Sequence, residues 1–462
     1  MRTVSTPAIP IEQEYINIFG APNDLDLKAI ATFIASNFFF DEDTWFNNRK
    51  VLRPGHTYSL DDQDNIIKKE KTFNWFYEPE ERSLDLIIDE FSQIFENIVS
   101  RETFEKKIVL PISGGLDSRS LVCALNGSTN VFSYTYEFEN GTKENSIGKA
   151  VANAAGLEHS AHTIKSGYLW DIISDAAEIN SCYSDFTSAR QLAIIDEIKD
   201  KGDVFLLGHW GDVLFDSMGQ AETLDEDQAV EVIKKKMLNP AGLELAQKLW
   251  EHWQLPDSVL DYLEGKIREI LSGIQIDNAN AKIRAFKSMT WAPRWTSSGV
   301  DLFKHYLPVS VPYYDDEMCR FICRTPEKFL ADRKIQIEYI KRKNRKIAEI
   351  PWQKFDPCNL YNYEQYYSFN YLPIRAWRKM RSLNGKSRIK RNWELQFFGE
   401  ENEEKLRSYL FDNKRLVEYI SMDILLEFYE KFKENPLRYA QSISMLLTFS
   451  VFLIKWQEGK FD

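Results

Sequence analysis

The sequence has few groups that could form a structural metal site or a disulfide framework. Its 462 residues include five cysteines, an odd number, and no Cys-x-x-Cys pair. This pattern indicates neither a zinc site nor a set of disulfides. Cys319 and Cys323 lie four residues apart on an apparent helix, where buried free thiols are the simpler interpretation. The cysteines therefore suit a reducing compartment.

A secretory signal and a long hydrophobic run are also missing from the sequence. The first residues, Met1–Pro7, contain no apolar h-region. The most apolar run, residues 443–454, is interrupted by hydroxyl groups. It is shorter than the roughly 20 residues that a bilayer-spanning helix needs. We expect this run to be a buried core helix, and we expect a cytoplasmic protein with no membrane partner.

Positive charge is not in excess, because the formal net charge is −12. This balance argues against a broad basic face for nucleic acid and favours small-molecule ligands. One local exception is residues 375–391, which contain eight lysines or arginines. A solvated helix–loop face is the favoured interpretation there, ahead of a phosphate-bearing or acidic partner. The chain is 44% hydrophobic and long enough for two or three domains, so we expect a globular protein.

The most informative stretch is residues 108–125, an apolar strand and an apolar helix joined by the turn Ser113-Gly-Gly-Leu-Asp-Ser118. The two glycines have no Cβ, so the backbone can turn tightly and direct its N–H groups at anionic oxygens. An ordinary turn of this kind usually needs one Gly or Asn. No lysine follows the glycines, so we expect Mg²⁺ on Asp117 to neutralise the phosphates. The stretch predicts a pyrophosphate cradle.

Strands and helices alternate around this turn. Strands are expected at 108–112, 131–136, 161–164 and 204–207, and helices at 118–125, 144–155 and 187–199. The alternation predicts an α/β fold with a doubly wound parallel sheet. Ligands of such sheets bind beyond the carboxyl ends of the strands. Asp117 and Asp212 both follow such ends, so we expect them within reach of one metal ion.

The turn and four later blocks resemble a known family. Ser-Gly-Gly-x-Asp-Ser is similar to the PP-loop of ATP pyrophosphatases, which activate a carboxylate or carbonyl oxygen as an adenylate. Blocks similar to those of asparagine synthetases follow in the same order and spacing, at residues 143–159, 207–215, 307–315 and 352–354. The chain thus resembles the asparagine synthetase family over roughly residues 85–360.

This resemblance implies the positions of an ATP site, a metal site and a catalytic lysine. The residues implied to bind ATP are Ser113, Gly114, Gly115, Asp117, Ser118, Tyr136 and Gly208. Asp117 and Asp212 would hold Mg²⁺. Lys354 would lie over the α-phosphate and the leaving pyrophosphate, where a fixed cation offsets the negative charge that builds up in the transition state.

His209 stands where asparagine synthetases have Glu and where β-lactam-forming relatives have Tyr. Imidazole titrates near neutrality, so His209 could be the base that deprotonates the nitrogen nucleophile. An orienting hydrogen-bond donor is the alternative, with similar weight. Val213 and Asp216-Ser217 replace the family's Glu and Gly-Gly, so aspartate need not be the substrate.

Three parts are expected along the chain. Residues 1–77 form a small α+β piece, in which 52–60 and 74–77 resemble only the closing hairpin of a glutaminase domain. Glutamine-dependent relatives begin with Cys after the initiator Met, and here that position is Arg2, so we interpret this piece as a truncated, structural remnant. Residues 83–221 would be the PP-loop ATP-binding core, and 222–462 an α-rich C-terminal lobe.

The resemblance implies an ATP-dependent amide-forming ligase that is asparagine synthetase-like. It would adenylate a carboxylate, release pyrophosphate and transfer the acyl group to a nitrogen nucleophile. A lactam- or macrocycle-forming or glycan- or peptide-tailoring enzyme is an alternative, and a non-catalytic nucleotide-binding scaffold is another. A tRNA-modifying enzyme is disfavoured by the acidic charge. The expected cofactors are ATP and Mg²⁺, and the expected partners are a small-molecule or peptide carboxylate and a separate nitrogen-donor or substrate-delivery protein.

Overall fold

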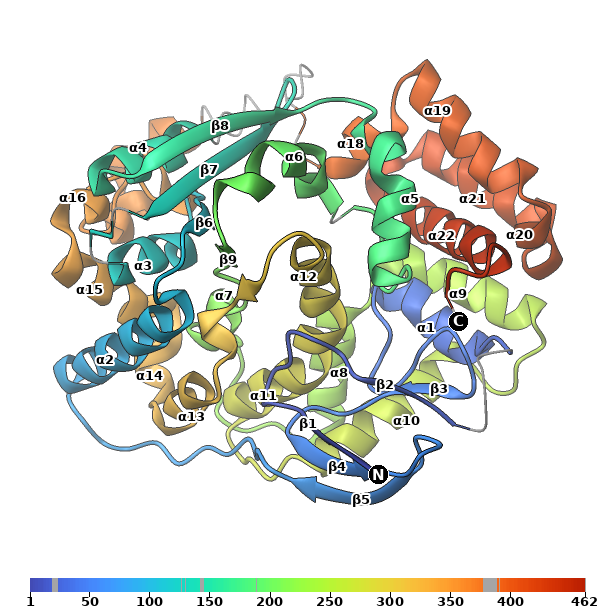
Figure 1. Cartoon of the computed structure of the whole chain (residues 1–462), viewed down its shortest axis with the longest axis horizontal. Coiled ribbons are helices and arrows are strands. Elements are labelled where there is room, and N and C mark those ends of the chain that lie inside the picture. The colour runs from blue at the N-terminus through green and yellow to red at the C-terminus, as the bar shows by residue number, and fades with distance from the viewer. Residues whose placement is uncertain are drawn as a thin grey trace.

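A computed structural model describes residues 1–18, 24–125, 127–128, 130–141, 145–187, 189–376, 389 and 391–461. Figure 1 shows a sheet flanked by helices on one side of the molecule, a second group of helices opposite it and a small N-terminal sheet below. Most of the basic segment 375–391 lies outside the described residues, as does the start of the block at 143–159. The prediction for that basic segment therefore stays a prediction.

The predicted parallel sheet is present and has five strands in the order β10-β9-β6-β7-β8. All four pairings are parallel. The strands are β6 (Ile108–Pro111), β7 (Val131–Phe138), β8 (Glu158–Ile164), β9 (Val204–Leu206) and β10 (Val309–Ser310). The expected α/β fold class with an α-rich C-terminal region is confirmed. Because β6 and β9 are neighbours, the two loops that carry the predicted metal ligands follow adjacent strands.

Helices cover this sheet at close range. The first ones are α2 (Leu84–Thr103), α3 (Leu116–Ala124) and α4 (Asn145–Ala155). Gly148 of α4 is needed for close packing, because a Cβ there would lie 2.1 Å from the Thr135 side chain on β7. Helix α2 buries an apolar face made of Ile87, Ile88, Phe91, Phe95, Ile98 and Val99.

Two parts of the predicted secondary structure differ from the structure. The helix expected at 187–199 is a series of short turns, η1 (Ala189–Ile194), α6 (Ile195–Ile198) and η2 (Lys199–Lys201), and α5 (Tyr168–Asn180) precedes it. Side chains of η1 bond to the sheet, since Gln191 accepts a hydrogen bond from the Tyr134 hydroxyl (2.8 Å). The fifth strand, β10, lies in the region expected to be helical. Its two residues are too few to show strand periodicity.

The C-terminal part of the chain is helical, apart from β10. Its elements are α7 (Gly211–Leu214), α8 (Glu226–Met237), α9 (Pro240–His252), α10 (Val259–Ser272), α11 (Ala279–Trp291), η3 (Ala292–Thr296), α12 (Ser297–Lys304), η4 (Pro312–Tyr314), α13 (Asp316–Arg324), α14 (Glu327–Leu330), η5 (Ala331–Arg333), α15 (Lys334–Lys343), α16 (Arg345–Ala348), η6 (Gln353–Phe355), η7 (Tyr363–Tyr367), η8 (Phe369–Tyr371), α18 (Asn392–Phe397), α19 (Glu400–Arg407), η9 (Ser408–Asp412), α20 (Lys414–Tyr419), α21 (Met422–Glu434) and α22 (Pro436–Gln457).

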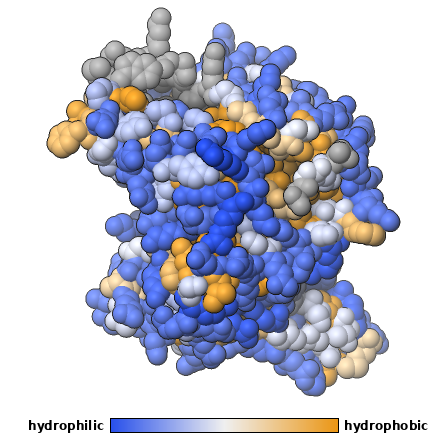
Figure 2. Space-filling view, turned by 90° about the vertical axis from the view of Figure 1, so that its left-hand side faces the viewer, coloured by the Kyte–Doolittle hydropathy of each residue, from blue (hydrophilic) through white to orange (hydrophobic). Residues whose placement is uncertain are grey.

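Helix α22 contains the apolar run at 443–454. It is 22 residues long, so by length and composition alone it could cross a membrane, but 78% of its most apolar window is buried inside the protein. The run is therefore part of a buried core helix, as expected, and the helix is longer than the run. Figure 2 shows that one face of the molecule is mostly hydrophilic, with apolar side chains in small separate patches.

The N-terminal piece combines two small antiparallel sheets with one helix. The sheets are β1 (Arg2–Ser5), β4 (His56–Leu60) and β5 (Ile66–Lys71), and β2 (Tyr15–Asn17) with β3 (Arg49–Val51). Helix α1 (Leu27–Ser36) packs against α9, and Trp45 stacks on Phe452 of α22 with ring centroids 4.0 Å apart. The piece thus shares one hydrophobic core with the C-terminal helices. The boundary near residue 77 stays a prediction.

One buried ion pair ties α11 to α14. Arg284 is 2% exposed and donates two hydrogen bonds to the Glu327 carboxylate, at 2.5 and 2.9 Å. The same guanidinium also donates to the carbonyl oxygens of Val213 (3.3 Å) and Asp216 (2.9 Å). This arginine therefore fixes the chain just after Asp212.

We expect Arg284→Met to lower the free energy of unfolding by about 3–5 kcal/mol, because it leaves a buried carboxylate without its partner. Arg268→Met is the control, since Arg268 is 38% exposed and pairs with Glu226 and Asp227 at the surface. The control should cost less than about 1 kcal/mol. Urea unfolding measures both, and equal losses would contradict a special role for Arg284.

Candidate functional site

The predicted phosphate-binding turn connects β6 to α3. Helix α3 begins at Leu116, two residues earlier than expected, so Asp117 and Ser118 belong to its first turn. No side chain of the described residues caps this helix start. Its N–H groups and the positive end of its dipole are therefore open to an anion.

Serine hydroxyls hold the turn in shape. The Ser113 N–H donates to Ser118 Oγ (3.1 Å), and the two hydroxyl oxygens lie 3.2 Å apart. The Gly115 N–H donates to Ser113 Oγ (3.2 Å). These bonds curl the turn over the start of α3. The structure thus brings together the five PP-loop residues that the resemblance assigned to ATP.

Asp117 and Asp212 lie next to each other across the sheet edge. A Cβ on Gly211 would come 2.2 Å from Asp117 Oδ1, and a Cβ on Gly208 would come 3.1 Å from the Asp117 Cβ. Only glycine allows the loop after β9 to approach this closely. The turn after β6 and the loop after β9 therefore meet where the sequence placed a metal site.

The chemistry of these side chains fits Mg²⁺. Both offer carboxylate oxygens, which are the hard ligands that this ion prefers. Within the described ranges, no group of three or more His, Cys, Asp or Glu side chains could hold a metal ion. Two carboxylates are enough for Mg²⁺ beside a nucleotide, because phosphates and waters complete its octahedral shell.

Asp117 is held by two residues that the sequence analysis did not identify. Gln336 Nε2 donates to Asp117 Oδ1 (2.9 Å), and so does the Arg333 guanidinium. Burial raises the pKa of Asp117, the Arg333 charge opposes that shift, and the nearby Asp212 adds to it. Arg333 has a left-handed backbone (φ 60°), an unfavourable conformation that often occurs at functional sites.

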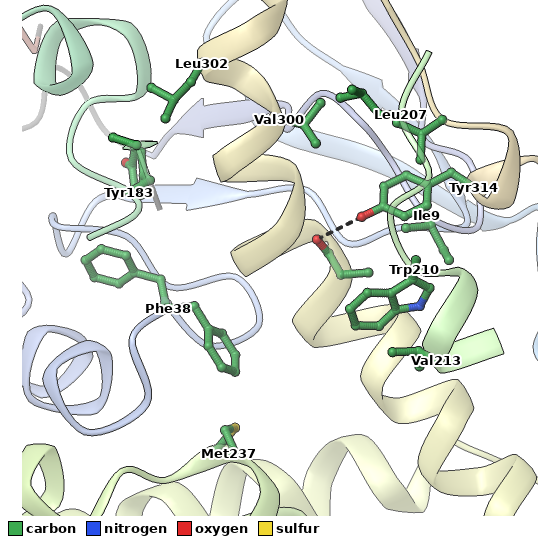
Figure 3. Packing of buried hydrophobic residues seen from close by; sticks show 14 of the residues in the cluster. Ile9, Phe38, Tyr183, Leu207, Trp210, Val213, Met237, Val300, Leu302 and Tyr314 are labelled. Atoms are coloured by element: carbon green, nitrogen blue, oxygen red, sulfur yellow. Dashed lines mark hydrogen bonds between the residues drawn. The ribbon is translucent and has the colours of Figure 1, made fainter. Parts of the chain in front are cut away.

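A strained residue also anchors the loop after β9. Trp210 has φ 74°, and its indole N–H donates to Ser288 Oγ of α11 (3.1 Å). Figure 3 shows Trp210 and Val213 beside Tyr314, whose hydroxyl donates to the Ala292 carbonyl (3.5 Å). Burial of Trp210 in this cluster offsets the backbone cost of about 1–3 kcal/mol.

Lys287 is a further cation at this loop that the sequence did not reveal. Its ammonium lies over the rings of Trp210 (5.5 Å) and Trp291 (4.9 Å). Burial lowers the pKa of Lys287 to about 8, although the Asp212 charge opposes the shift. Because it lies on α11, far from the motifs in sequence, no local pattern distinguishes it from a surface lysine.

His209 lies on the same loop and is partly buried. Burial lowers its pKa to about 4, the Arg190 charge adds to this shift, and Asp212 opposes it. None of the described residues hydrogen-bonds its Nδ1. The expectation that this imidazole titrates near neutrality is therefore wrong, because His209 is uncharged at pH 7.

Tyr136 and Gly208 lie at the same edge of the sheet. Tyr136 is near the end of β7, and its hydroxyl accepts a hydrogen bond from Arg190 Nε (2.8 Å). Gly208 follows β9 and faces Asp117. Arg190 thus lies between the ends of β7 and β9, and the sequence analysis missed it.

Lys354 is brought to the phosphate-binding turn by its neighbour. It lies on η6, where the Gln353 N–H donates to the Gly114 carbonyl (3.3 Å). A Cβ on Gly114 would come 2.6 Å from the Gln353 Cβ, so glycine is needed here as well. The Lys354 side chain is exposed, with its ammonium near the rings of Phe355 (5.2 Å) and Trp352 (5.8 Å).

Arg2 stands at the position of the catalytic cysteine of glutamine-dependent relatives, and its side chain offers no nucleophile. Arg2 is exposed on β1 and forms an ion pair with Asp64 (3.2 Å). The five cysteines are free and buried. Burial raises the pKa of the Cys123 thiol to about 12, so this thiol is a poor nucleophile.

A parallel sheet with a PP-loop, adjacent carboxylates and a nearby lysine defines a PP-loop nucleotide-binding ligase. The family profile described as asparagine synthase matches residues 90–343, more than half of the chain. The chain belongs to the asparagine synthase family, which uses ATP. No curated protein sequence matches it.

Two solved structures are similar to part of this chain. An NMN synthetase from Francisella tularensis is 14% identical, with 45% of this chain and 93% of that chain covered and a TM-score of 0.23. An NH3-dependent NAD synthetase from Campylobacter jejuni is also 14% identical, with coverages of 41% and 94% and a TM-score of 0.21.

We expect Gly211→Ala to weaken Mg²⁺-dependent ATP binding at least tenfold, because the new methyl group would displace the Asp117 carboxylate. Gly265→Ala is the control: Gly265 lies on α10, and no described atom outside its own helix backbone lies within 4 Å of a Cβ there. That change should leave ATP binding intact and stabilise the protein by up to about 1 kcal/mol. Calorimetric titration with an ATP analogue compares them, and unchanged affinity in Gly211→Ala would contradict the site.

Proposed function

We propose that the protein is an ATP-dependent ligase that adenylates a carboxylate, releases pyrophosphate and transfers the acyl group to a nitrogen nucleophile. The observation that carries this proposal is the meeting of the PP-loop, the Asp117–Asp212 pair and Lys354 at one edge of the sheet. A phosphate chain at the start of α3 would lie among all three.

Each group has a part in the first half-reaction. The N–H groups of the turn and the hydroxyls of Ser113 and Ser118 hold the phosphates. Mg²⁺, bound by Asp117 and Asp212, would neutralise phosphate charge. Lys354 stabilises the charge that develops as the carboxylate oxygen attacks the α-phosphate and pyrophosphate leaves. Its exposed ammonium is free to approach the α-phosphate, and the Gln353–Gly114 contact sets its position.

In the second half-reaction the nitrogen attacks the acyl carbon and AMP leaves. With a pKa near 4, the His209 imidazole is neutral, so one ring nitrogen can donate a hydrogen bond that orients the substrate while the other accepts one. A base this weak holds a proton poorly, so the orienting role is the better supported of the two. The acyl substrate is a small-molecule or peptide carboxylate.

The proposed nitrogen source is not glutamine hydrolysed by the described residues, because their five cysteines are all buried. A separate nitrogen-donor or substrate-delivery protein remains part of the proposal. A non-catalytic scaffold is less well supported, since it would not need a lysine on the segment that Gln353 joins to the PP-loop. The proposed function is tested by measuring pyrophosphate release with each of a set of carboxylates and recording the product masses. The Asp117→Asn variant should release no pyrophosphate.

We expect Lys354→Ala to lower the adenylation rate about 10²–10³-fold while changing the apparent affinity for ATP much less, because the ammonium acts mainly in the transition state. Lys341→Ala is the matched control, since Lys341 also lies over an aromatic ring, that of Tyr361 (5.4 Å). Initial rates of pyrophosphate release at varied ATP separate kcat from KM. A Lys354→Ala variant with only a raised KM would place the lysine elsewhere.

The low pKa of His209 predicts how enzyme activity changes at acidic pH. Activity should fall as the pH approaches 4, where the imidazole becomes protonated, and should not fall near 6.5. His209→Gln should keep activity within about tenfold at pH 7, because Gln can still form hydrogen bonds but cannot take up a proton. A loss above a hundredfold in this variant, together with loss of the acid limb, would establish base catalysis instead.

A further inference from the structure

A cavity of about 520 Å³ lies beside the predicted ATP site. Its walls come from the end of β7 (136–138), η1, the start of α18 and the first turn of α22. In Figure 1, α18 and α22 lie to the right of β7 and β8. Tyr136 and Arg190 line both this cavity and the site edge, so a ligand here would be next to the acyl group.

The lining of the cavity is rich in arginine. Arg190, Arg391 and Arg438 contribute three guanidinium groups, against the carboxyl groups of Glu137 and Asp185. Arg438 is exposed (54%) and is also ion-paired with Glu244 (3.1 Å). Asp185 is buried, and its carboxylate already accepts hydrogen bonds from Thr187 and Ser444. Guanidinium groups recognise carboxylates and phosphates. The lining therefore favours a ligand with an anionic group.

The cavity also offers an acceptor that lacks a donor. Asn392 is 8% exposed, and its Nδ2 donates to the Thr187 carbonyl. No residue in the described part of the chain donates to Asn392 Oδ1. A buried oxygen without a hydrogen bond is costly, by about 1–3 kcal/mol. Asn392 Oδ1 is itself closed to solvent, so an amine or ammonium N–H of a ligand would satisfy it after the Asn392 amide moves toward the cavity.

The volume argues against ammonia as the only occupant. A water molecule, close in size to ammonia, takes about 30 Å³ in the liquid. The cavity is more than ten times larger and falls in the range of roughly 300–1,000 Å³ typical of small-molecule sites. Ammonia also has no anionic group that the three arginines could bind.

We propose that this cavity binds the nitrogen-bearing substrate, a molecule that carries a primary amine together with a carboxylate or similar anion, such as an amino acid or a peptide. This inference rests on the proposed function and names its acceptor. The amine nitrogen forms a bond to the acyl carbon of the adenylate, the bond from that carbon to the phosphate oxygen breaks, AMP leaves, and the nitrogen loses one proton to solvent.

The test is binding of a probe panel to the purified full-length chain by calorimetry. The panel holds the twenty amino acids and glycyl dipeptides, with butylamine as an amine without an anion and glutarate as an anion without an amine. At least one amino acid or dipeptide should bind at least tenfold more tightly than both controls. The inference is overturned if none binds, or if butylamine binds equally well.

Variants then locate the binding. Arg438→Gln and Asn392→Leu should each weaken the bound probe at least tenfold, whereas Asn392→Asp keeps an acceptor oxygen and should retain it. Arg415→Gln is the control, because Arg415 is also exposed and paired with a glutamate, Glu418 (2.7 Å), and does not line the cavity. Equal effects of Arg415→Gln and Arg438→Gln would overturn the assignment.

Binding of α,β-methylene-ATP separates the cavity from the ATP site. It should be unchanged in Arg438→Gln and Asn392→Leu, and a parallel loss would show that the cavity belongs to ATP, which overturns the inference. Asp117→Asn should abolish pyrophosphate release and leave probe binding intact. Probe binding without any pyrophosphate release in the unmodified protein would contradict the proposed function alone. Pyrophosphate release without probe binding would contradict only the acceptor site.

Discussion

The site depends on a buried arginine that pairs with no carboxylate of the described residues. Arg119 of α3 is fully buried and donates to the backbone carbonyls of Ile350 (3.0 Å) and Pro351 (2.5 Å), just before the segment that carries Lys354. Burial lowers its pKa to about 10, so it remains charged at pH 7. Because an isolated buried charge is costly, these carbonyls cannot move away without a large penalty. The PP-loop helix therefore holds the lysine segment in place.

The sequence predicted the parts of the site that local patterns determine. The turn from Ser113 to Ser118 and the strand–helix alternation led to the parallel sheet, and the rule about strand ends placed Asp117 beside Asp212. It could not predict Arg119, Arg190 or Arg333, because their roles arise from tertiary contacts of helices and short turns. The lowered pKa of His209 was also missed, since it depends on burial that composition does not show.

Packing across the whole chain joins the N-terminal piece to the C-terminal helices. Gln441 of α22 donates to the Ile34 carbonyl of α1 (2.9 Å), so segments about four hundred residues apart are in direct contact. The first turn of α22 also forms part of the cavity wall, with Asn37 from the end of α1. The N-terminal piece therefore helps to shape the cavity, and its removal would open both the core and the cavity.

The local charge at the site differs in sign from that of the whole protein. The chain carries −12 overall, yet Arg333 bonds to Asp117, Lys287 lies over Trp210 of the loop that carries Asp212, Arg190 bonds to Tyr136, and Lys354 follows the PP-loop contact of Gln353. Such a local field attracts anions even when the protein as a whole repels them. If Mg²⁺ neutralised the Asp117–Asp212 pair, as proposed, these cations would be left to bind the phosphates. The arrangement thus supports stabilisation of a charge that grows on the phosphates, which is what adenylation of a carboxylate requires.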